Sequence, residues 1–327
     1  MKGKVSPKLV EMLVCPACRS SVKLLERKLV CINNICGLEF PMIEGIPIML
    51  RETLESDLEL SREKWSLEYQ SRYDLDKMDL KNDPELRDAY LLVKKYERHL
   101  KDGLFLEAGC GPSRLSCLLA KEGVKTVGLD FSLNALVLAR RLFEREGIDG
   151  FFICGNILEM PFRNYLFSYI YTGGVLEHFK NTQKAANEIY RCLAYGGFTT
   201  NTVPYLSLST FYKMLRWGNI PDIPTLRNFI ELIETKILKG KRMRFGYEKS
   251  FSARKIKRVF MNAGFRNLEI GLFRTYYTLD WVHSKFLRKL ITKIADSSTL
   301  FWPMIYVNAV KNGFDCKSIR GHSSSSD

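Results

Sequence analysis

The sequence predicts an α/β protein with a parallel-rich sheet flanked by helices, preceded by a small β-rich metal-binding module. Residues 103 to about 203 alternate short apolar strands with amphipathic helices, the pattern of a parallel sheet. A glycine-rich junction, GLFLEAGCGPS, joins the first of these strands to the next helix. Two pairs of cysteines lie near the N-terminus, which predicts a separate module there.

Composition supports a globular protein. The chain has 327 residues, of which 46% are hydrophobic, enough to build a full core. It has no apolar run of about 18 residues and no signal peptide, so we expect a cytoplasmic protein without a transmembrane helix. In that compartment its nine cysteines would be metal ligands or buried thiols. The net charge of +14 suits phosphates, nucleic acid or anionic lipid, or equally a solvated basic surface.

Four segments are expected along the chain. Residues 1–50 form the cysteine module, and 51–102 form a helical linker or N-terminal cap with helical spacing. Residues 103–314 form the α/β domain, with a cap insertion at about 205–250 and a second insertion at about 275–300. Residues 315–327 end in HSSSSD, a low-complexity tail that we expect to be disordered.

The cysteine pairs have the spacing of a metal site. Cys15 and Cys18 are two residues apart in CPAC, and Cys31 and Cys36 follow in CINNIC. Two such turns bring four thiolates to one ion, which suits structural Zn²⁺ in a closed site; iron has the same ligand preference. A core of roughly 50 residues is small, so the metal would stabilise the module. The alternative is four unligated cysteines in a small β domain.

The stretch from Leu13 to Leu50 resembles a known module. LVCPAC, LVCINNIC and FPMIEGIPIML are similar to the zinc ribbons related to the small activator subunit of tRNA and protein methyltransferases. A more distant similarity is to the zinc finger of a bacterial 23S rRNA guanine methyltransferase. That finger has a His as its fourth ligand, where this chain has Cys36.

The order of residues around the glycines separates two kinds of nucleotide site. Glu107 precedes Gly109 and Gly111, and a carboxylate there suits a cationic ligand better than a pyrophosphate. Arg114 occupies the position where a dinucleotide fingerprint requires a third glycine. The next strand ends in Asp130, whose carboxylate can accept both hydroxyls of a ribose.

At this point the chain resembles the class I S-adenosylmethionine-dependent methyltransferases. Ser113 replaces a usual third glycine, and Gly155-Asn156-Ile157 replaces the usual Gly-Asp pair, although an Asn oxygen can still accept from adenine. YIYTGGVLEHF, residues 169–179, is similar to the motif of small-molecule methyltransferases, including those of quinone and lipid-headgroup pathways. The resemblance implies these donor-binding residues: Glu107, Gly109, Gly111, Asp130, Phe131, Asn156, Ile157 and Gly173.

The same resemblance implies a Rossmann-like sheet of seven strands with an antiparallel last strand. We expect strands near 104–108, 126–130, 150–154, 167–172, 197–203, 267–273 and 304–311. His178 is the candidate catalytic base, because it follows the fourth strand at the mouth of the donor site. The alternative is that His178 only shapes the pocket.

The insertions bear on the methyl acceptor. Leu226, Phe229, Ile230, Ile233 and Ile237 share one helical face, followed by basic residues, and HSKFLRKLITKIAD is a second basic amphipathic piece. Such faces pack on the core, or they contact a membrane that carries a lipid-linked acceptor. We therefore predict methyl transfer to a small-molecule or lipid-linked acceptor. The rivals are an RNA methyltransferase, with Tyr276, Tyr277 and Trp281 available for stacking, and a non-catalytic activator protein.

Overall fold

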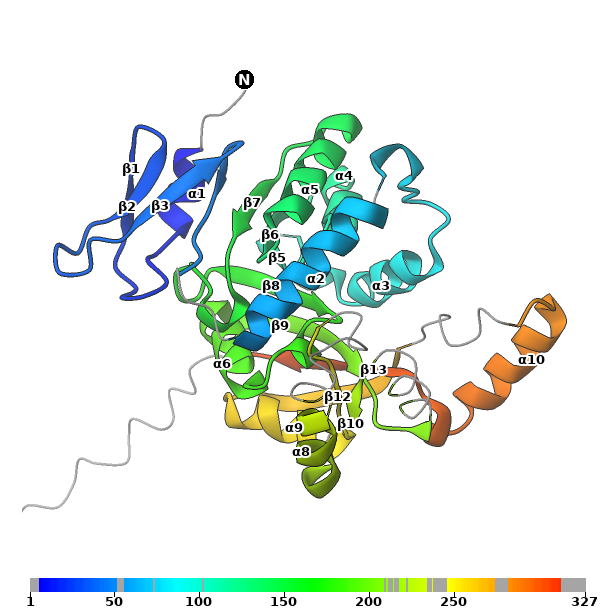
Figure 1. Ribbon diagram of the computed structural model, residues 1–327. Coiled ribbons are helices and arrows are strands. Elements are labelled where there is room, and N and C mark those ends of the chain that lie inside the picture. Colours follow the sequence, from blue (N-terminus) through cyan, green and yellow to red (C-terminus); the bar gives the residue numbers. More distant parts are fainter. Residues whose placement is uncertain are drawn as a thin grey trace, which may run out of the picture.

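A seven-stranded sheet is the centre of the protein in the computed structural model (Figure 1). Its strands are β5 Leu104–Ala108, β6 Lys125–Asp130, β7 Phe151–Cys154, β8 Phe167–Gly173, β9 Leu193–Pro204, β12 Arg266–Phe273 and β13 Met304–Val310. The structure describes residues 6–51, 56–72, 74–101, 103–208, 210, 214, 218–221, 223–233, 237, 246–273 and 282–312.

The strand order confirms the predicted fold class. The strands lie in the order β12-β13-β9-β8-β5-β6-β7. The pairs β8–β9, β5–β8, β5–β6 and β6–β7 are parallel, whereas β13 runs antiparallel to both of its neighbours. This is the Rossmann-like arrangement with an antiparallel last strand, and every expected strand is present within about three or four residues of its predicted bounds.

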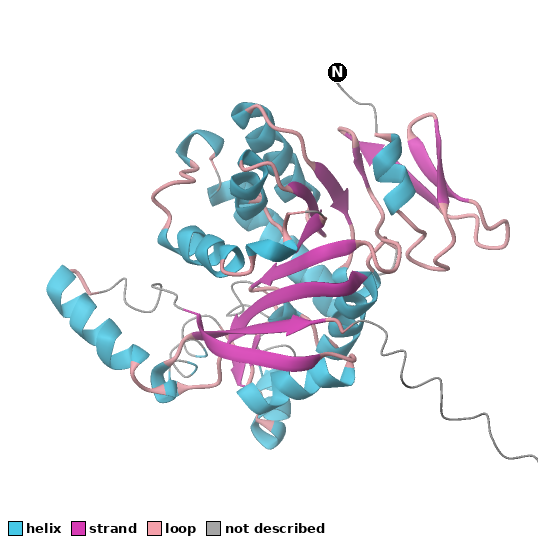
Figure 2. Ribbon diagram, turned by 180° about the vertical axis from the view of Figure 1, so that it is seen from behind, coloured by secondary structure: helices cyan, strands magenta, loops and turns pink. Residues whose placement is uncertain are grey.

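Helices cover both faces of the sheet (Figure 2). Helices α3 Pro84–Lys94, α4 Arg114–Lys121 and α5 Leu133–Glu146 lie on one face, and α6 Thr182–Cys192 and α9 Ala253–Asn262 lie on the other. Alternation along β5 explains the two layers, because successive side chains of a strand point to opposite faces. Phe105 packs with α3 and α4, and the next residue, Leu106, belongs to the cluster of α6 and α9.

The N-terminal module packs directly on this domain. It consists of α1 Pro7–Met12 and the antiparallel strands β1 Val22–Leu25, β2 Lys28–Cys31, β3 Glu39–Ile43 and β4 Ile46–Pro47. Its buried residues, including Leu13, Leu29 and Phe40, belong to the same hydrophobic cluster as Phe162 of the α/β domain. The module therefore extends its small core by packing on the α/β domain, and its stabilisation by a metal stays a prediction.

Backbone hydrogen bonds join the module to the edge of the sheet. The Met49 N–H donates to the Cys154 carbonyl oxygen at 2.7 Å, at the end of edge strand β7. The Val14 N–H donates to the Pro161 carbonyl oxygen at 2.9 Å. An exposed strand edge presents unpaired N–H and C=O groups. The module covers part of that edge and holds the segment that follows β7.

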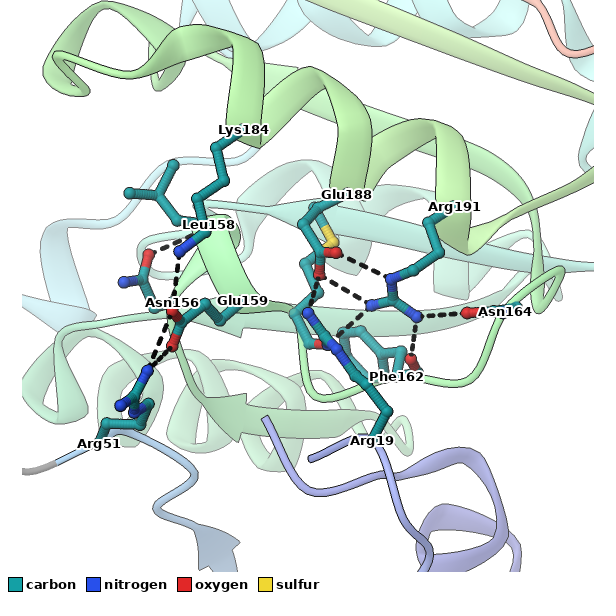
Figure 3. A network of polar contacts seen from close by, with 11 residues as sticks. Arg19, Arg51, Asn156, Leu158, Glu159, Phe162, Asn164, Lys184, Glu188 and Arg191 are labelled. Carbon is teal, nitrogen blue, oxygen red and sulfur yellow. Dashed lines mark hydrogen bonds and ion pairs between the residues drawn. The ribbon is translucent and has the colours of Figure 1, made fainter. Parts of the chain in front are cut away.

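Ion pairs continue the same interface (Figure 3). Arg19 of the module reaches Glu188 of α6 at 3.0 Å and donates to the Met160 carbonyl oxygen at 2.6 Å. Glu188 also accepts from Arg191 at 2.8 Å, so one carboxylate joins two guanidinium groups. Nearby, Glu159 pairs with Arg51 at 3.3 Å and with a lysine of α6 at 2.8 Å.

Further elements surround the sheet. They are α2 Ser56–Arg72, α8 Pro224–Leu232, α10 Lys285–Asp296, the two-residue strands β10 Ile220–Pro221 and β11 Lys249–Ser250, and the 3₁₀ turns η1 Leu75–Lys77, η2 Glu97–His99, η3 Ile157–Glu159, η4 Leu176–His178 and η7 Thr299–Phe301. None of the described helices is long and apolar enough to cross a membrane.

The apolar face at 226–237 differs from the expectation that it packs on the core. Leu226, Phe229 and Ile237 are exposed, and of this set Ile230 packs against a small buried cluster. The face is therefore not simply covered by the core. The basic residues expected after it, at 236–244, and the aromatic residues 276, 277 and 281 lie outside the described residues, as does the tail 315–327.

Replacing Glu188 by Ala should lower the free energy of unfolding by about 2 kcal/mol, because Arg19 and Arg191 would lose a largely buried carboxylate partner. Urea denaturation measures the change. The matched control is Glu39→Ala, which breaks an exposed ion pair with Lys28 and should cost less than about 0.5 kcal/mol. Equal losses for the two variants would contradict the importance of this interface.

Candidate active site

The loop between β5 and α4 bends sharply at its glycines. Gly109 and Gly111 have φ angles of +76° and +50°, a region that side-chain-bearing residues rarely adopt. A Cβ on Gly109 would lie 2.4 Å from Cγ2 of Val175, and a Cβ on Gly111 would lie 2.7 Å from the Tyr69 hydroxyl. Ser113, which replaces the usual third glycine, also has a positive φ of +57° and is fully buried. The loop therefore requires both backbone freedom and close approach.

Asp130 fixes this loop from the neighbouring strand. Its Oδ2 accepts from the Gly111 N–H at 2.8 Å, and its Oδ1 accepts from the Ser132 N–H at 2.8 Å. Burial raises the pKa of Asp130 to about 6, and these backbone donors act in the opposite direction. Each carboxylate oxygen has a second lone pair, so the group retains capacity for further donors such as ribose hydroxyls.

Glu107 is turned toward the following helix. Its Oε2 accepts from the Ser116 N–H at 3.0 Å and from the Ser116 hydroxyl at 2.5 Å, in the first turn of α4. Burial raises the pKa of Glu107 to about 7, against the effect of these hydrogen bonds. A carboxylate near a helix N-terminus also interacts favourably with the helix dipole. In this structure Glu107 therefore ties the end of β5 to the first turn of α4.

The other residues predicted to bind the methyl donor lie at the same edge of the sheet, where its parallel strands end. Asn156 follows β7, and its Oδ1 accepts from the Leu158 N–H at 2.9 Å, so the amide oxygen that adenine would need already has one partner. Ile157 is buried beside it in η3. Phe131 follows Asp130 directly, and Gly173 ends β8 with an exposed backbone. Because parallel strands end at one edge of the sheet, the eight predicted residues meet there.

Helix α2 contributes aromatic residues that the sequence analysis did not identify. Trp65 and Tyr69 stack with ring centroids 5.5 Å apart, and Tyr69 is buried against Gly111. Ser66 contacts the Ser132 hydroxyl at 3.2 Å, just beyond Asp130. The stretch KWSLEYQ carried the signal: two aromatic residues four apart share one face of an otherwise charged helix.

His178 lies beside this helix with a defined orientation. Its Nδ1 is 2.7 Å from the Tyr247 carbonyl oxygen, which can only accept, so Nδ1 carries the proton and Nε2 of the neutral ring is the basic nitrogen. The Trp65 ring meets the imidazole edge-on at 5.8 Å. Burial lowers the pKa of His178 below its ordinary value. Such a ring is neutral at pH 7 and able to accept a proton.

The four N-terminal cysteines come together as predicted. Their sulfur atoms all lie within 4.8 Å of one another, with Cys15 3.7 Å from Cys36 and Cys18 3.4 Å from Cys31. Sulfurs about 2.3 Å from a shared zinc ion stand at comparable separations, roughly 3.8 Å. The four thiols therefore fit a metal, and they offer no open position. Cys110, Cys117, Cys154 and Cys192 are buried thiols, as expected.

Residues 106–200 match a family described as "Methyltransferase domain". Over 58 residues the chain is 41% identical to a UPF0434 protein of Stutzerimonas stutzeri and covers 95% of it, with 17% of this chain. The chain belongs to the UPF0434 family over these 58 residues, and its seven-stranded α/β unit has the fold of the class I methyltransferases.

Two further similarities cover longer segments of the chain. The chain is 31% identical over 111 residues to the demethylmenaquinone methyltransferase of Thermus thermophilus, which is 34% of this chain and 49% of that protein. The curated relatives that match more than 100 residues of the chain are covered over only about half of their own length. Geranyl diphosphate C-methyltransferase from Streptomyces coelicolor, solved with S-adenosyl-L-homocysteine, shares the fold at a TM-score of 0.52 and 15% identity, covering 79% of this chain and 98% of that one.

Every predicted residue of the donor site and His178 fall within the matched part of the methyltransferase domain. The UPF0434 relative is a protein of about 60 residues, since 58 residues make up 95% of it. That is close to the size of the four-cysteine module, which spans the first 50 residues or so.

Replacing Gly109 by Ala should destabilise the methyltransferase domain by about 3 kcal/mol, from backbone strain and the contact with Val175. Gly123→Ala is the matched control. Gly123 has a similar φ of +86° with nothing near its Cβ, so only the strain of about 1–2 kcal/mol applies. Urea denaturation of both variants measures the difference. Equal losses would show that the close approach at Gly109 does not matter.

Proposed function

We propose that the protein is an S-adenosylmethionine-dependent methyltransferase that acts on a small-molecule or lipid-linked acceptor. The observation that carries the proposal is the position of Asp130. Its carboxylate lies at the end of β6 and accepts from the Gly111 N–H, while Asn156 follows the end of β7 and caps η3. Ribose and adenine groups need acceptors at these two neighbouring strand ends. The methyltransferase family match and the relative that methylates demethylmenaquinone support the same reading.

The residues of the chain would act mainly by orientation. When bound, S-adenosylmethionine supplies a methyl group on a sulfonium, an activated leaving group. Asp130 would hold the ribose, Asn156 and Ile157 the adenine, and the Gly109–Gly111 backbone the amino-acid part. Helix α2 lies across this edge through Tyr69 and would exclude water. Proximity and alignment supply much of the acceleration for such a displacement.

His178 is the proposed base for an acceptor that must lose a proton. Its Nδ1 is engaged by the Tyr247 carbonyl oxygen, which favours Nε2 as the proton acceptor. Its lowered pKa keeps the ring neutral at physiological pH. General-base catalysis requires both of these properties.

We propose structural Zn²⁺ for the cysteine module. Four thiols within 4.8 Å match the donor set that zinc prefers, and a set with no open position suits a structural role. The module contacts the methyltransferase domain at Cys154, Met160 and Glu188. Unfolding of the module would therefore displace the segment that carries Asn156.

Replacing Asp130 by Asn should raise the dissociation constant of S-adenosylmethionine at least about tenfold, since one acceptor oxygen is replaced by a donor. Isothermal titration measures the constant. For the unaltered protein, affinity should also fall as pH drops through about 6, where Asp130 binds a proton. Asp149→Asn, an exposed change before β7, is the control. Unchanged affinity in Asp130→Asn would reject the donor-site assignment, and no affinity in any form would favour a non-catalytic protein.

Replacing His178 by Gln should lower kcat about 10²- to 10⁴-fold and leave donor affinity within twofold, because Gln can keep the contact to Tyr247 but cannot take a proton. The acceptor for this assay comes from mass-shift screening of cell extracts. In the unaltered protein, kcat/KM should rise with pH below about 6.5 and then level off. Loss of donor affinity with unchanged kcat would assign His178 to the shape of the pocket instead.

Replacing Cys15 and Cys36 by Ser should remove bound zinc and lower the melting temperature of the protein. Elemental analysis should give one zinc per chain for the unaltered protein. Cys192→Ser is the control, because Cys192 is buried in α6 away from the cluster and should leave the zinc content unchanged. A metal-free protein that melts at the same temperature would reject the structural role.

A further inference from the structure

Helix α10 presents an apolar face that the described part of the chain leaves uncovered. The helix is inserted between β12 and β13 and projects from the body of the protein (Figure 1). None of its residues is buried. Phe286 is 78% exposed and Ile294 is 56% exposed, and Leu287 and Leu290 are exposed as well. Large apolar side chains gathered in this way mark an interaction surface.

The spacing of these residues makes a continuous stripe. Phe286, Leu290 and Ile294 are each four residues apart, so they lie one above another on the helix, with Leu287 beside them. Of the basic residues, Lys285 and Arg288 lie on the opposite side of the helix, whereas Lys289 and Lys293 flank the stripe on the side of Phe286. An apolar stripe opposite a basic face is the pattern of a helix that lies in a membrane interface.

The helix is locally well formed, so the stripe is a stable feature. Ser284 caps its N-terminus by accepting from the Leu287 N–H at 3.3 Å. Arg288 donates to the Val282 carbonyl oxygen at 2.9 Å, just before the helix. At the other end, the Trp302 Nε1–H donates to the Asp296 carbonyl oxygen at 3.2 Å. The turn η7 follows, and its Leu300 and Phe301 are also exposed.

We propose that α10 docks this protein on an anionic lipid surface. The stripe of Phe286, Leu287, Leu290 and Ile294 would enter the interface, while lysines 285, 289 and 293 meet the lipid phosphates. Charge complementarity favours this occupant, since the helix carries four basic residues and one acidic residue, on a chain of net charge +14. RNA phosphates would use the lysines but leave the apolar stripe in water. A second copy of the chain would bring equal positive charges together.

The topology gives the docking a consequence for catalysis, which rests on the proposed function. β12 is parallel to β9, because both run antiparallel to β13. The insertion that contains α10 leaves the sheet after Phe273, at the end of β12, and returns at Met304. That edge also carries Gly111, Asp130 and Asn156. Docking through α10 would therefore bring the donor-binding edge near the bilayer, where a lipid-linked acceptor resides.

Vesicle co-sedimentation of the full-length protein tests the docking without donor or acceptor. Vesicles of phosphatidylcholine with about a third phosphatidylglycerol should bind the protein, and pure phosphatidylcholine should bind it much more weakly. Phe286→Ser with Leu290→Ser should reduce the partition coefficient at least about tenfold. The matched control is Leu91→Ser, an exposed leucine on α3, which should not change binding.

A second set of variants separates the helix from the overall charge. Lys285→Gln, Lys289→Gln and Lys293→Gln together should weaken binding roughly a hundredfold, at about fivefold for each charge. Arg254→Gln, Lys257→Gln and Arg258→Gln remove the same charge from exposed positions of α9 and should have a much smaller effect. Equal effects of the two triple variants would overturn the assignment to α10.

Three further results would overturn the proposal. One is vesicle binding that stays the same when Phe286 and Leu290 are replaced by Ser. Another is tight binding of an RNA duplex that depends on the three lysines but not on the stripe, which would assign α10 to RNA. The last is a dimer in light scattering that the serine variants dissociate. Titration with S-adenosylmethionine, expected to be unchanged in all variants, keeps this outcome separate from the proposed function.

Discussion

The buried carboxylate of Asp130 is the constraint on which the candidate site depends. It accepts N–H groups from the glycine loop and from the start of α5, so it joins the ends of two neighbouring strands. Because the carboxylate is buried, each of these hydrogen bonds is made in a setting where an unpaired charge would be costly. The loop, in turn, can approach Asp130 only because Gly109 and Gly111 adopt positive φ angles. The positive φ angles of the glycines and the hydrogen bond to the buried carboxylate therefore both fix the backbone of the glycine loop.

A second layer surrounds this centre from distant parts of the chain. Helix α2 brings Tyr69 to the glycine loop and Trp65 to His178. Tyr247, more than sixty residues after His178, holds the imidazole through its backbone carbonyl. The cysteine module holds the end of β7 at Cys154 and the segment after it at Pro161. A change in any of these elements would therefore alter the position of residues in the candidate site through these contacts.

The module and the domain also share their core, which alters what a metal would do. Leu13, Leu29 and Phe40 of the module pack in one cluster with residues of the sheet, and Arg19 and Glu188 join the two parts at the rim. A separate zinc ribbon would need the metal to fold at all. Here the hydrophobic cluster contributes as well, so four thiolates and an apolar interface act together.

Sequence patterns alone predicted the sheet, the glycine loop, the order of Glu107, Gly109, Gly111 and Asp130, and the grouping of the four cysteines. These features depend on short-range patterns: apolar periodicity, positive-φ glycines and ligand spacing act within a few residues. Packing between distant segments sets three other features: Glu107 binds the first turn of α4, Trp65 and Tyr247 meet at His178, and, among the residues that the structure describes, apolar side chains on α8 and α10 stay exposed. The physical reason is that these outcomes depend on which segments pack together. An amphipathic helix has the same sequence pattern whether it packs on its own core or on another surface.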